Sequence, residues 1–264
     1  MSDLMADLTR IRAALREAAL LVRRHAQGVV HFEMKPGHGP VTAADFEVDA
    51  LLAKLLPQHG DGWLSEETKD DPSRLSCRRV WVVDPIDGTS SFIAGRPEYS
   101  ISIALVIDGV PVLGGVANPA SDVTIAGGPG LGIIVEGDPR QAFGELPSGA
   151  LRVLCSRSEW HRGEWDHWQG EPMLCVRPMG SVAYKLALIA AGAAEATWTL
   201  HGKNEWDVAA GVALVRAAGG EAWLPGRGEP RFNLPTPLFR SFAAAGPGLG
   251  SRVRDFLVRE NRLG

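Results

Sequence analysis

The sequence predicts an α/β protein in which helices pack against a sheet. Apolar residues recur every three or four positions from Leu4 to Val22, with charged residues between them, a spacing typical of an amphipathic helix. The apolar run at residues 80–83 is rich in β-branched side chains, which favours a buried strand. Asp108-Gly109 separates two further apolar runs and predicts a hairpin turn. Helices and antiparallel strands are therefore both expected in the first half of the chain.

The composition is that of an ordinary globular protein and argues against several functional classes. The chain has 264 residues, enough for one large domain or two smaller ones. A net charge of −4 provides no basic surface for nucleic acid and no polybasic anchor for a membrane. Three widely spaced cysteines suit a reducing compartment better than a disulfide framework. With no signal-peptide pattern and no apolar run long enough to span a bilayer, we expect a cytoplasmic protein that has neither a nucleic-acid nor a membrane partner.

The N-terminal segment predicts two helices joined by a loop. The first helix is expected to end near Gly28, and segment 34–40, which contains two glycines and two prolines, is a predicted loop. A second helical pattern covers residues 46–55. Thr42 can cap this helix, and Asp45 lies in its first turn, where the helix dipole favours an anion. On these residues alone, Asp45 is a helix-start carboxylate.

Two carboxylates flank a break directly after the predicted strand at residues 80–83. Pro85 lacks a backbone donor and fixes φ, so the strand is expected to break at Asp84-Pro85. Asp84 and Asp87 then lie at the C-terminal edge of the strand, with the carbonyl of Ile86 between them. Carboxylate and carbonyl oxygens are the ligands that Mg²⁺ prefers. The alternative is an Asx-type turn with two solvated aspartates.

A segment of small residues, Gly88 to Ser91, follows the second carboxylate. Gly88 lets the backbone approach an anion closely. Backbone N–H groups from Gly88 to Ser90 could cradle a phosphate, more so if a helix begins there. Two adjacent acids, Glu66 and Glu67, stand at the end of an earlier predicted strand, and on their own they could be solvated surface residues.

The middle of the chain predicts antiparallel hairpins, which suggest a sheet that helices cover on one face. Strands are expected at residues 98–106, 110–116, 123–126 and 133–135. The glycine-rich run 128–132 is predicted to be a turn rather than a dinucleotide loop, because no long helix follows it. Segment 141–149, rich in Gly, Pro and Ser, is the best candidate boundary, and we divide the chain into domains 1–145 and 146–264.

The second half begins with predicted strands at residues 151–155 and 173–176. A helix opens at Gly180-Ser181, and its N-terminus could face an anion or hydroxyl of a ligand. Small residues at 209–211 let another helix, which begins near Asp207, pack tightly. On its own, Asp207 could be only a carboxylate at a helix N-terminus. The remainder predicts short strands and a helix at 253–257.

The motif Asp84-Pro85-Ile86-Asp87-Gly88-Thr89 resembles the signature of the inositol monophosphatase superfamily. Trp206-Asp207 with Ala209-Ala210-Gly211 is similar to the second signature of that family. Segments 35–45 and 63–68 also match, so that the blocks stand in family order over nearly the whole chain. The resemblance implies a Mg²⁺-dependent, lithium-sensitive phosphatase with a layered αβαβα sandwich fold. It also implies an N-terminal α+β half with most metal ligands and a C-terminal α/β half with the substrate cleft and the last ligand.

The resemblance implies roles for individual residues. Two or three Mg²⁺ ions are bound by the carboxylates of Glu66, Asp84, Asp87 and Asp207 and by the carbonyl of Ile86. The attacking water is held by Glu66 and by Thr89, which is paired with Asp45. The phosphate is bound at the backbone of Gly88, Thr89 and Ser90. Contacts to the substrate are assigned to Asp87, Gly180, Ser181 and Glu205, and Lys35 lies on a flexible loop over the metal site.

The activity implied is hydrolysis of a small phosphorylated polyol, as by an inositol-1-monophosphatase, in an expected homodimer. The runner-up is a 3′(2′),5′-bisphosphate nucleotidase, because Glu98-Tyr99 and Ser156-Arg157-Ser158 look similar to that branch. Ser90-Ser91 counts against it, since that branch frequently has Lys-Glu there. A fructose-1,6-bisphosphatase is a weaker alternative, because no basic cluster for a second phosphate is evident. A non-catalytic metal-binding or RNA-polymerase-associated protein is the remaining alternative, and the intact set of ligands argues against it.

Overall fold

The computed structural model describes residues 2–25, 31–34, 39–141, 143–199 and 201–259. The α-helices are α1 (Ser2–Arg24), α2 (Ala43–Leu55), α3 (Thr89–Ile93), α4 (Arg157–His161), α5 (Val182–Ala190), α6 (Glu205–Ala217) and α7 (Gly250–Arg259). Two short 3-10 helices are η1 (Pro72–Ser76) and η2 (Asp166–Trp168). The first helix was expected to continue to Gly28. It ends at Arg24, and Gly28 lies outside the described residues.

One sheet belongs to the first half of the chain. Its six strands are β3 (Gly62–Ser65), β4 (Arg79–Asp87), β5 (Ser100–Ile107), β6 (Val110–Asn118), β7 (Val123–Gly128) and β8 (Gly132–Glu136), and they lie side by side in this order. Strands β3 and β4 are parallel, and the other neighbours are antiparallel. Asp108 and Gly109 both have positive φ and form the predicted hairpin turn between β5 and β6.

A second sheet belongs to the second half. Its five strands lie in the order β10 (Leu174–Met179), β9 (Leu151–Ser156), β11 (Ala196–Thr199), β15 (Phe242–Ala245) and β13 (Glu221–Trp223). Two small strand pairs complete the fold, β1 (Phe32–Met34) with β2 (Pro40–Thr42) and β12 (Lys203–Asn204) with β14 (Leu238–Phe239). The predicted loop 34–40 is therefore flanked by paired strands.

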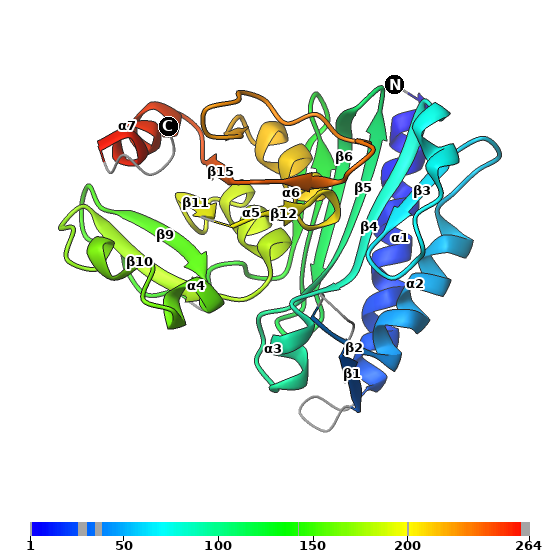
Figure 1. Cartoon of the computed structure of the whole chain (residues 1–264), viewed down its shortest axis with the longest axis horizontal. Coiled ribbons are helices and arrows are strands. Elements are labelled where there is room, and N and C mark those ends of the chain that lie inside the picture. Colours follow the sequence, from blue (N-terminus) through cyan, green and yellow to red (C-terminus); the bar gives the residue numbers. More distant parts are fainter. Residues whose placement is uncertain (1, 26–30, 35–38, 142, 200, 260–264) are drawn as a thin grey trace.

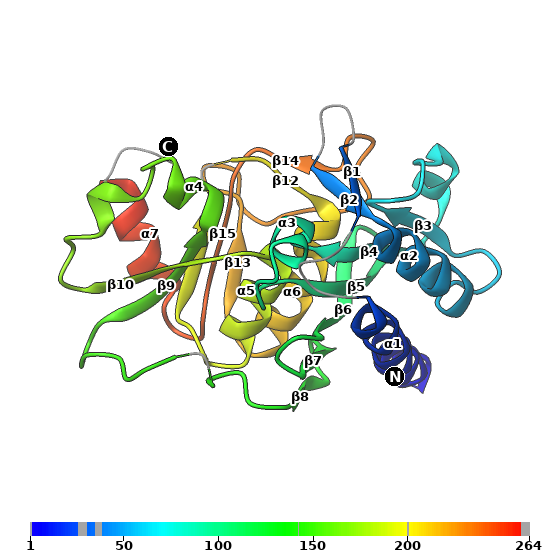
Figure 2. The same ribbon diagram turned by 90° about the horizontal axis from the view of Figure 1, so that it is seen from below.

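Helices and sheets alternate in layers, as Figures 1 and 2 show from two sides. Helices α1 and α2 pack on one face of the six-stranded sheet, α5 and α6 lie between the two sheets, and α7 covers the five-stranded sheet. The predicted α/β class and the αβαβα sandwich are confirmed. Among the described helices, none combines the length and the apolar character that crossing a bilayer would need.

The hairpin pattern suggested helices on one face of the first sheet, whereas helices cover both of its faces, as the αβαβα sandwich requires. Trp81 and Val83 of β4 point into the apolar cluster under α1 and α2, whereas Val80 and Val82 point into the cluster under α5 and α6. Because successive residues of a strand face opposite sides, a continuous apolar run such as 80–83 is what a sheet buried on both faces requires. The second cluster contains residues of both halves of the chain. The division into domains 1–145 and 146–264 remains a prediction.

The packing of α6 on the second face of the sheet requires a very close approach between the backbones of β6 and α6. A Cβ atom added at Gly114 would lie 2.2 Å from the carbonyl oxygen of Ala210. Both groups are backbone, so no side-chain rotation can relieve the clash. Glycine at this position therefore sets how closely α6 lies on the sheet.

We predict that Gly114→Ala lowers the free energy of unfolding by about 1–3 kcal/mol, because the added methyl group overpacks a rigid contact. Urea unfolding followed by circular dichroism measures this change. Gly170→Ala is the matched control, since nothing lies within 4 Å of a Cβ atom at that position. Equal stability of the two variants would contradict the close approach.

Candidate active site and metal centre

The end of β4 carries the first two carboxylates of the site. The strand was predicted to break at Asp84-Pro85. It instead continues to Asp87, with a register shift against β5 between Asp84 and Asp87. Pro85 has no N–H for the ladder, so the irregularity falls where a hydrogen bond cannot form. Such bulges re-aim side chains. Asp84 and Asp87 are both buried here rather than solvated, which argues against the alternative of a simple turn.

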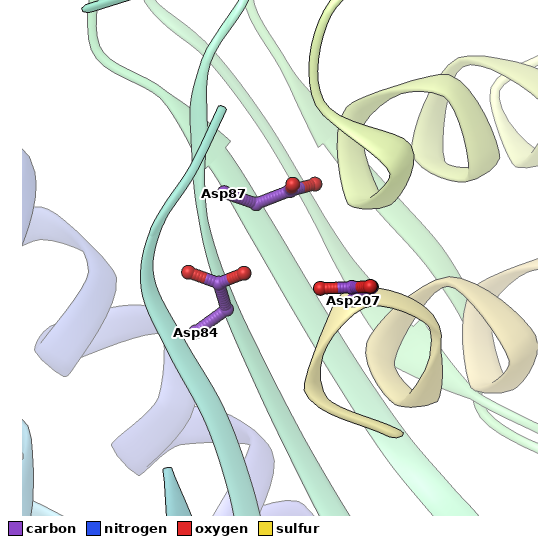
Figure 3. Close-up of side chains that lie close together, drawn as sticks. All are labelled: Asp84, Asp87 and Asp207. Atoms are coloured by element: carbon purple, nitrogen blue, oxygen red, sulfur yellow. The ribbon is translucent and has the colours of Figure 1, made fainter. Parts of the chain in front are cut away.

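The third carboxylate comes from the start of α6. Asp207 accepts a hydrogen bond from the backbone N–H of Asn204 at 2.9 Å, in a capping box with Asn204. Its carboxylate nevertheless reaches the end of β4. One oxygen each of Asp84, Asp87 and Asp207 lie within 4.8 Å of one another (Figure 3). Asp207 is thus both a helix-start carboxylate and a member of an acidic cluster.

The environment of Asp84 suits a ligand of a cation. Asp84 is 1% exposed, and within the described part of the chain no group donates a hydrogen bond to either of its oxygens. Burial raises its pKa well above the ordinary value, and the neighbouring Glu66, Asp87 and Asp207 raise it further. Burial, with the charge of Asp87, likewise raises the pKa of Asp207 to about 7. A divalent cation would compensate the negative charge of these three carboxylates, and all three offer oxygen atoms, the donors that Mg²⁺ prefers.

Glu66 stands directly after β3, next to the end of β4. Its N–H donates to the carbonyl of Val83 at 3.3 Å, and its charge contributes to the raised pKa of Asp84. Asp49 of α2 fixes the turn around it by accepting hydrogen bonds from the hydroxyl groups of Ser65 and Thr68, each at 2.5 Å. This role of Asp49 was not predicted from the sequence. Its helical spacing gave no signal of that role.

The structure also brings Thr89 and Asp45 together, as the resemblance implies. The hydroxyl of Thr89 lies 3.0 Å from Asp45 Oδ1 and 2.9 Å from the carbonyl of Ile86, and its single proton can be donated to only one of them at a time. The other oxygen of Asp45 accepts from the N–H of Thr42 at 2.8 Å and from its hydroxyl at 2.5 Å. Asp45 therefore caps α2 and holds Thr89 at once. The catalytic roles of this pair and the ligand role of the Ile86 carbonyl remain predictions.

The segment after Asp87 forms a tight turn into α3. Gly88 has φ of 94°, and a Cβ atom there would lie 3.0 Å from the carbonyl of Glu98 and 3.2 Å from the nitrogen of Ser181. Only glycine fits both this conformation and this space. The first N–H groups of α3, those of Thr89 and Ser90, have no acceptor within the helix, as at any helix start. Phosphate binding by residues 88–90 remains a prediction that this arrangement permits.

The start of α5 lies against Asp87. The hydroxyl of Ser181 donates to Asp87 Oδ2 at 2.8 Å, and the N–H of Ala183 donates to the same oxygen at 2.6 Å. Asp87, Gly88, Ser90, Gly180 and Ser181 line one cavity of about 270 Å³. Most of the residues predicted to contact phosphate or substrate therefore line the same cavity, whereas Thr89 does not.

Three basic residues, Arg96, Arg157 and Lys185, line the same cavity. Arg157 stands in the segment that resembles the nucleotidase branch, whereas Arg96 and Lys185 were not predicted from the sequence. Arg157 forms an ion pair with Glu98, with its Nε donating at 3.0 Å. Lys185 is buried, its ammonium group lies 3.4 Å from the carbonyl of Met179, and burial together with the nearby Lys203 lowers its pKa to about 8. A lone lysine inside the apolar helix 182–190 was the available signal.

Two predicted residues are not placed in this site. Glu205 is 0% exposed, does not line the cavity, and accepts hydrogen bonds from the N–H groups of Asn233 at 2.7 Å and Leu234 at 2.8 Å. Both oxygens are thus used inside the protein, which differs from the contact to substrate hydroxyls that the resemblance implies. Lys35 lies outside the described residues.

Comparisons with known proteins point to one family. The model of the inositol monophosphatase family matches residues 5–245. An inositol-1-monophosphatase of Mycobacterium leprae is 32% identical over 238 residues, which cover 85% of this chain and 80% of that protein. A probable inositol 1-monophosphatase of Mycobacterium tuberculosis, ImpA, is 31% identical over 275 residues, which cover 97% of this chain and 96% of that protein.

Solved structures share the fold. CysQ from Bacteroides thetaiotaomicron, a bacterial member of the inositol monophosphatase family, is similar with a TM-score of 0.75 at 24% identity, covering 91% of this chain and 97% of that one. The IMPase of Thermotoga maritima is similar with a TM-score of 0.74 at 26% identity, covering 98% and 99%. Both likenesses extend over nearly the full length of the chains.

We predict that divalent cations bind more tightly as pH rises. In the metal-free protein the pKa of Asp207 is about 7, and a protonated carboxyl must lose its proton before it becomes a ligand. Titration of Mg²⁺ by calorimetry between about pH 6 and pH 8, in buffers of different ionisation enthalpy, should show proton release and a rising affinity. Affinity that does not change with pH would contradict the assignment.

The thermal midpoint of the metal-free protein provides the control for that prediction. A carboxyl whose pKa is raised on folding stabilises the folded state while it is protonated, and this contribution is lost as pH rises through about 7. The part of the decline that comes from the cluster should disappear when the cation is saturating, because the ion then replaces the proton.

Proposed function

The chain belongs to the inositol monophosphatase family, whose members are metal-dependent phosphatases, and on this premise we propose that it is a Mg²⁺-dependent phosphomonoesterase acting on a small phosphorylated polyol such as inositol 1-phosphate. The observation that carries the proposal is the cluster of the buried Asp84 and Asp87 with the half-buried Asp207, in which Asp84 has two oxygens without donors among the described residues. The resemblance also underlies our proposals of lithium sensitivity and of a homodimer, and the sparse, widely spaced cysteines underlie the proposal of a cytoplasmic location.

The proposed ligand set joins three elements. Asp84, Asp87 and the Ile86 carbonyl from the end of β4, Glu66 after β3 and Asp207 from α6 would hold two or three Mg²⁺ ions. When bound, the metal supplies Lewis-acid activation of a water and neutralisation of charge on the leaving oxygen. The carboxylates supply the negative field that retains the ions at this point, and the bulge in β4 keeps two of them together.

The remaining residues orient the reactants. When the hydroxyl of Thr89 donates to Asp45, its oxygen lone pairs are free to accept a hydrogen bond from the attacking water, and Glu66 holds that water from the other strand. The backbone at Gly88, Thr89 and Ser90 binds the phosphate oxygens. Gly180 and Ser181 line the side of the cavity where the alcohol portion of the substrate lies. Catalysis then depends chiefly on positioning and on charge neutralisation.

A second candidate, a 3′(2′),5′-bisphosphate nucleotidase, is favoured by one observation. Arg157, which the sequence had linked to this branch, lines the cavity next to Asp87 together with Arg96 and Lys185. Positive groups there suit a substrate with a second anionic group. Because Arg157 is already paired with Glu98, the basic character depends mainly on Arg96 and Lys185. We keep this function as the alternative.

We predict that Asp84→Asn lowers phosphate release by roughly 100-fold or more, because it removes a ligand whose ion contributes several kcal/mol to the transition state. The fold should persist, and the metal-free variant should unfold at a higher temperature than the wild type, since a buried unpaired carboxylate has been removed. Asp108→Asn in the β5–β6 turn is the control and should keep full activity. Near-normal turnover in Asp84→Asn would refute the proposed site.

The substrate is tested by phosphate release from inositol 1-phosphate and from 3′-phosphoadenosine 5′-phosphate with Mg²⁺, each with and without lithium. We predict preferential, lithium-sensitive release from the inositol phosphate, with a KM that Lys185→Met changes little. If the nucleotide is preferred, and Lys185→Met raises its KM about tenfold or more, as loss of one charged contact would, the second candidate replaces the first. No release from either compound with cation bound would favour a non-catalytic protein.

A further inference from the structure

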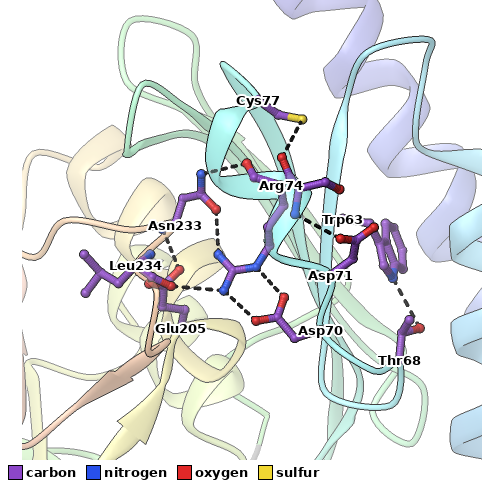
Figure 4. A network of polar contacts seen from close by, with 10 residues as sticks. Trp63, Thr68, Asp70, Asp71, Arg74, Cys77, Glu205, Asn233 and Leu234 are labelled. Carbon is purple, nitrogen blue, oxygen red and sulfur yellow. Dashed lines mark hydrogen bonds and ion pairs between the residues drawn. The ribbon is translucent and has the colours of Figure 1, made fainter.

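Arg74 of η1 is a buried arginine, and each of its three guanidinium nitrogens donates to a named acceptor (Figure 4). It is 1% exposed. Its Nε and Nη2 atoms donate to the two oxygens of Asp70 at 2.6 Å and 2.9 Å. Its Nη1 atom donates to Asn233 Oδ1 at 2.7 Å, and Nη2 also donates to the carbonyl of Leu234 at 3.0 Å. A planar guanidinium held in this way has one orientation, which a lysine could not reproduce.

Glu205 also binds the turn at Asn233 and Leu234 that Arg74 contacts. The two carboxylate oxygens of Glu205 accept the N–H groups of Asn233 and Leu234 at 2.7 Å and 2.8 Å. Asn233 also donates from Nδ2 to the backbone carbonyl of Arg74 at 3.1 Å. Its φ of 59° is left-handed, a conformation that Asn tolerates better than most residues. Arg74, Asn233, Leu234 and Glu205 thus form one continuous clamp, a term we use for these four residues.

The clamp connects the segment that follows Glu66, in the first half of the chain, with the start of α6, which carries Asp207 in the second half. Glu66 and Asp207 are both proposed metal ligands. Arg74 lies in the segment that follows Glu66, and it packs under β3, where a Cβ atom at Gly62 would lie 3.1 Å from the Cβ atom of Arg74. Glu205 is the first residue of α6, and Asp207 lies within the same helical turn. A displacement of the clamp would therefore move the Asp207 carboxylate relative to Glu66 and Asp84.

The acidic cluster needs such a restraint. Asp84, Asp87 and Asp207 are like charges brought close together, so their repulsion pushes the start of α6 away from β4 when no cation is bound. The capping box ties Asp207 only to its own helix. A hydrogen bond of 3.2 Å from the Ser102 hydroxyl to the Trp206 carbonyl holds α6 toward the sheet. The clamp adds a second restraint, because its buried charged hydrogen bonds connect the start of α6 with the segment around Arg74.

We propose that Arg74 is a positioning residue that fixes Asp207 against the Glu66 segment and thereby sets the affinity of the site for its catalytic metal. The role rests on the proposed metal-dependent function. Arg74 touches neither the three-aspartate cluster nor the cavity, so it acts through Glu205 and the start of α6. Removing a group that hydrogen-bonds directly to a metal ligand typically changes metal affinity by about 10- to 100-fold, and we expect Arg74, which acts one step further from the ligands, at the lower end of that range.

The test compares Mg²⁺ binding in three variants of the full chain. Arg74→Met removes the guanidinium contacts of the clamp. Asn233→Gly removes the contacts of the Asn233 side chain with Arg74 and still permits the positive φ at this position. Arg79→Met is the matched control, because Arg79 pairs with Asp7 and Asp61 at 3.0 Å each but lies at the opposite end of β4 from the cluster. Calorimetric titration, the shift of thermal midpoint with Mg²⁺, and the Mg²⁺ concentration for half-maximal phosphate release are measured for each.

The Kd for Mg²⁺ is expected to rise about 10-fold or more in Arg74→Met, by a smaller factor in Asn233→Gly, and not at all in Arg79→Met. Turnover of the clamp variants should recover at high Mg²⁺, since the catalytic groups are unchanged. An unchanged Kd in both clamp variants, with lowered thermal midpoints only, would overturn the proposal and leave Arg74 a purely structural residue. Absence of Mg²⁺ binding by the wild type would instead overturn the proposed function, and the metal role of Arg74 with it.

Discussion

The structure depends on one electrostatic constraint, the convergence of like-charged carboxylates in a buried place. Asp84, Asp87 and Asp207 come from two elements distant in the sequence, and folding alone does not favour their proximity. Local features of the backbone and local hydrogen bonds hold them in place. A register shift at a proline aims Asp84 and Asp87, hydrogen bonds from the start of α5 fix Asp87, and a capping box fixes Asp207. The fold thus prepares a negatively charged site for which a divalent cation is the natural counterpart.

Close packing of backbones makes this convergence possible. Helix α6 can bring Asp207 to the end of β4 only because it lies directly on the first sheet, and Gly114 opposite Ala210 allows that approach. Gly88 and Gly180 do the same for the start of α5, where a Cβ atom at Gly180 would lie 2.4 Å from the Ser91 hydroxyl oxygen. The close packing of the layers therefore sets how far apart the three carboxylates lie, while hydrogen bonds set the orientation of each carboxylate.

Local patterns in the sequence predicted the elements well, and contacts between distant segments explain what they missed. The spacing of apolar residues in α1 and the Asp108-Gly109 turn are local signals, so both were found. The helices on the second face of the sheet, the burial of Glu205 and the cavity-lining Lys185 depend on which segments meet, which no local spacing records. The acidic cluster was found because its residues stand in long motifs. Arg74 was missed because η1 carries no pattern of its own.

The cavity beside the acidic cluster is polarised, and its positive end depends on few groups. Arg157 is neutralised by Glu98, and Arg96 is exposed, so that the buried charge is that of Lys185. Burial lowers the pKa of Lys185 to about 8, which means that its proton is held weakly when the cavity contains only water or a neutral polyol. A second anionic group on the substrate would raise that pKa and strengthen the contact. On the proposed function, Lys185 is therefore the buried positive group that a second anionic group of a substrate would meet in this cavity.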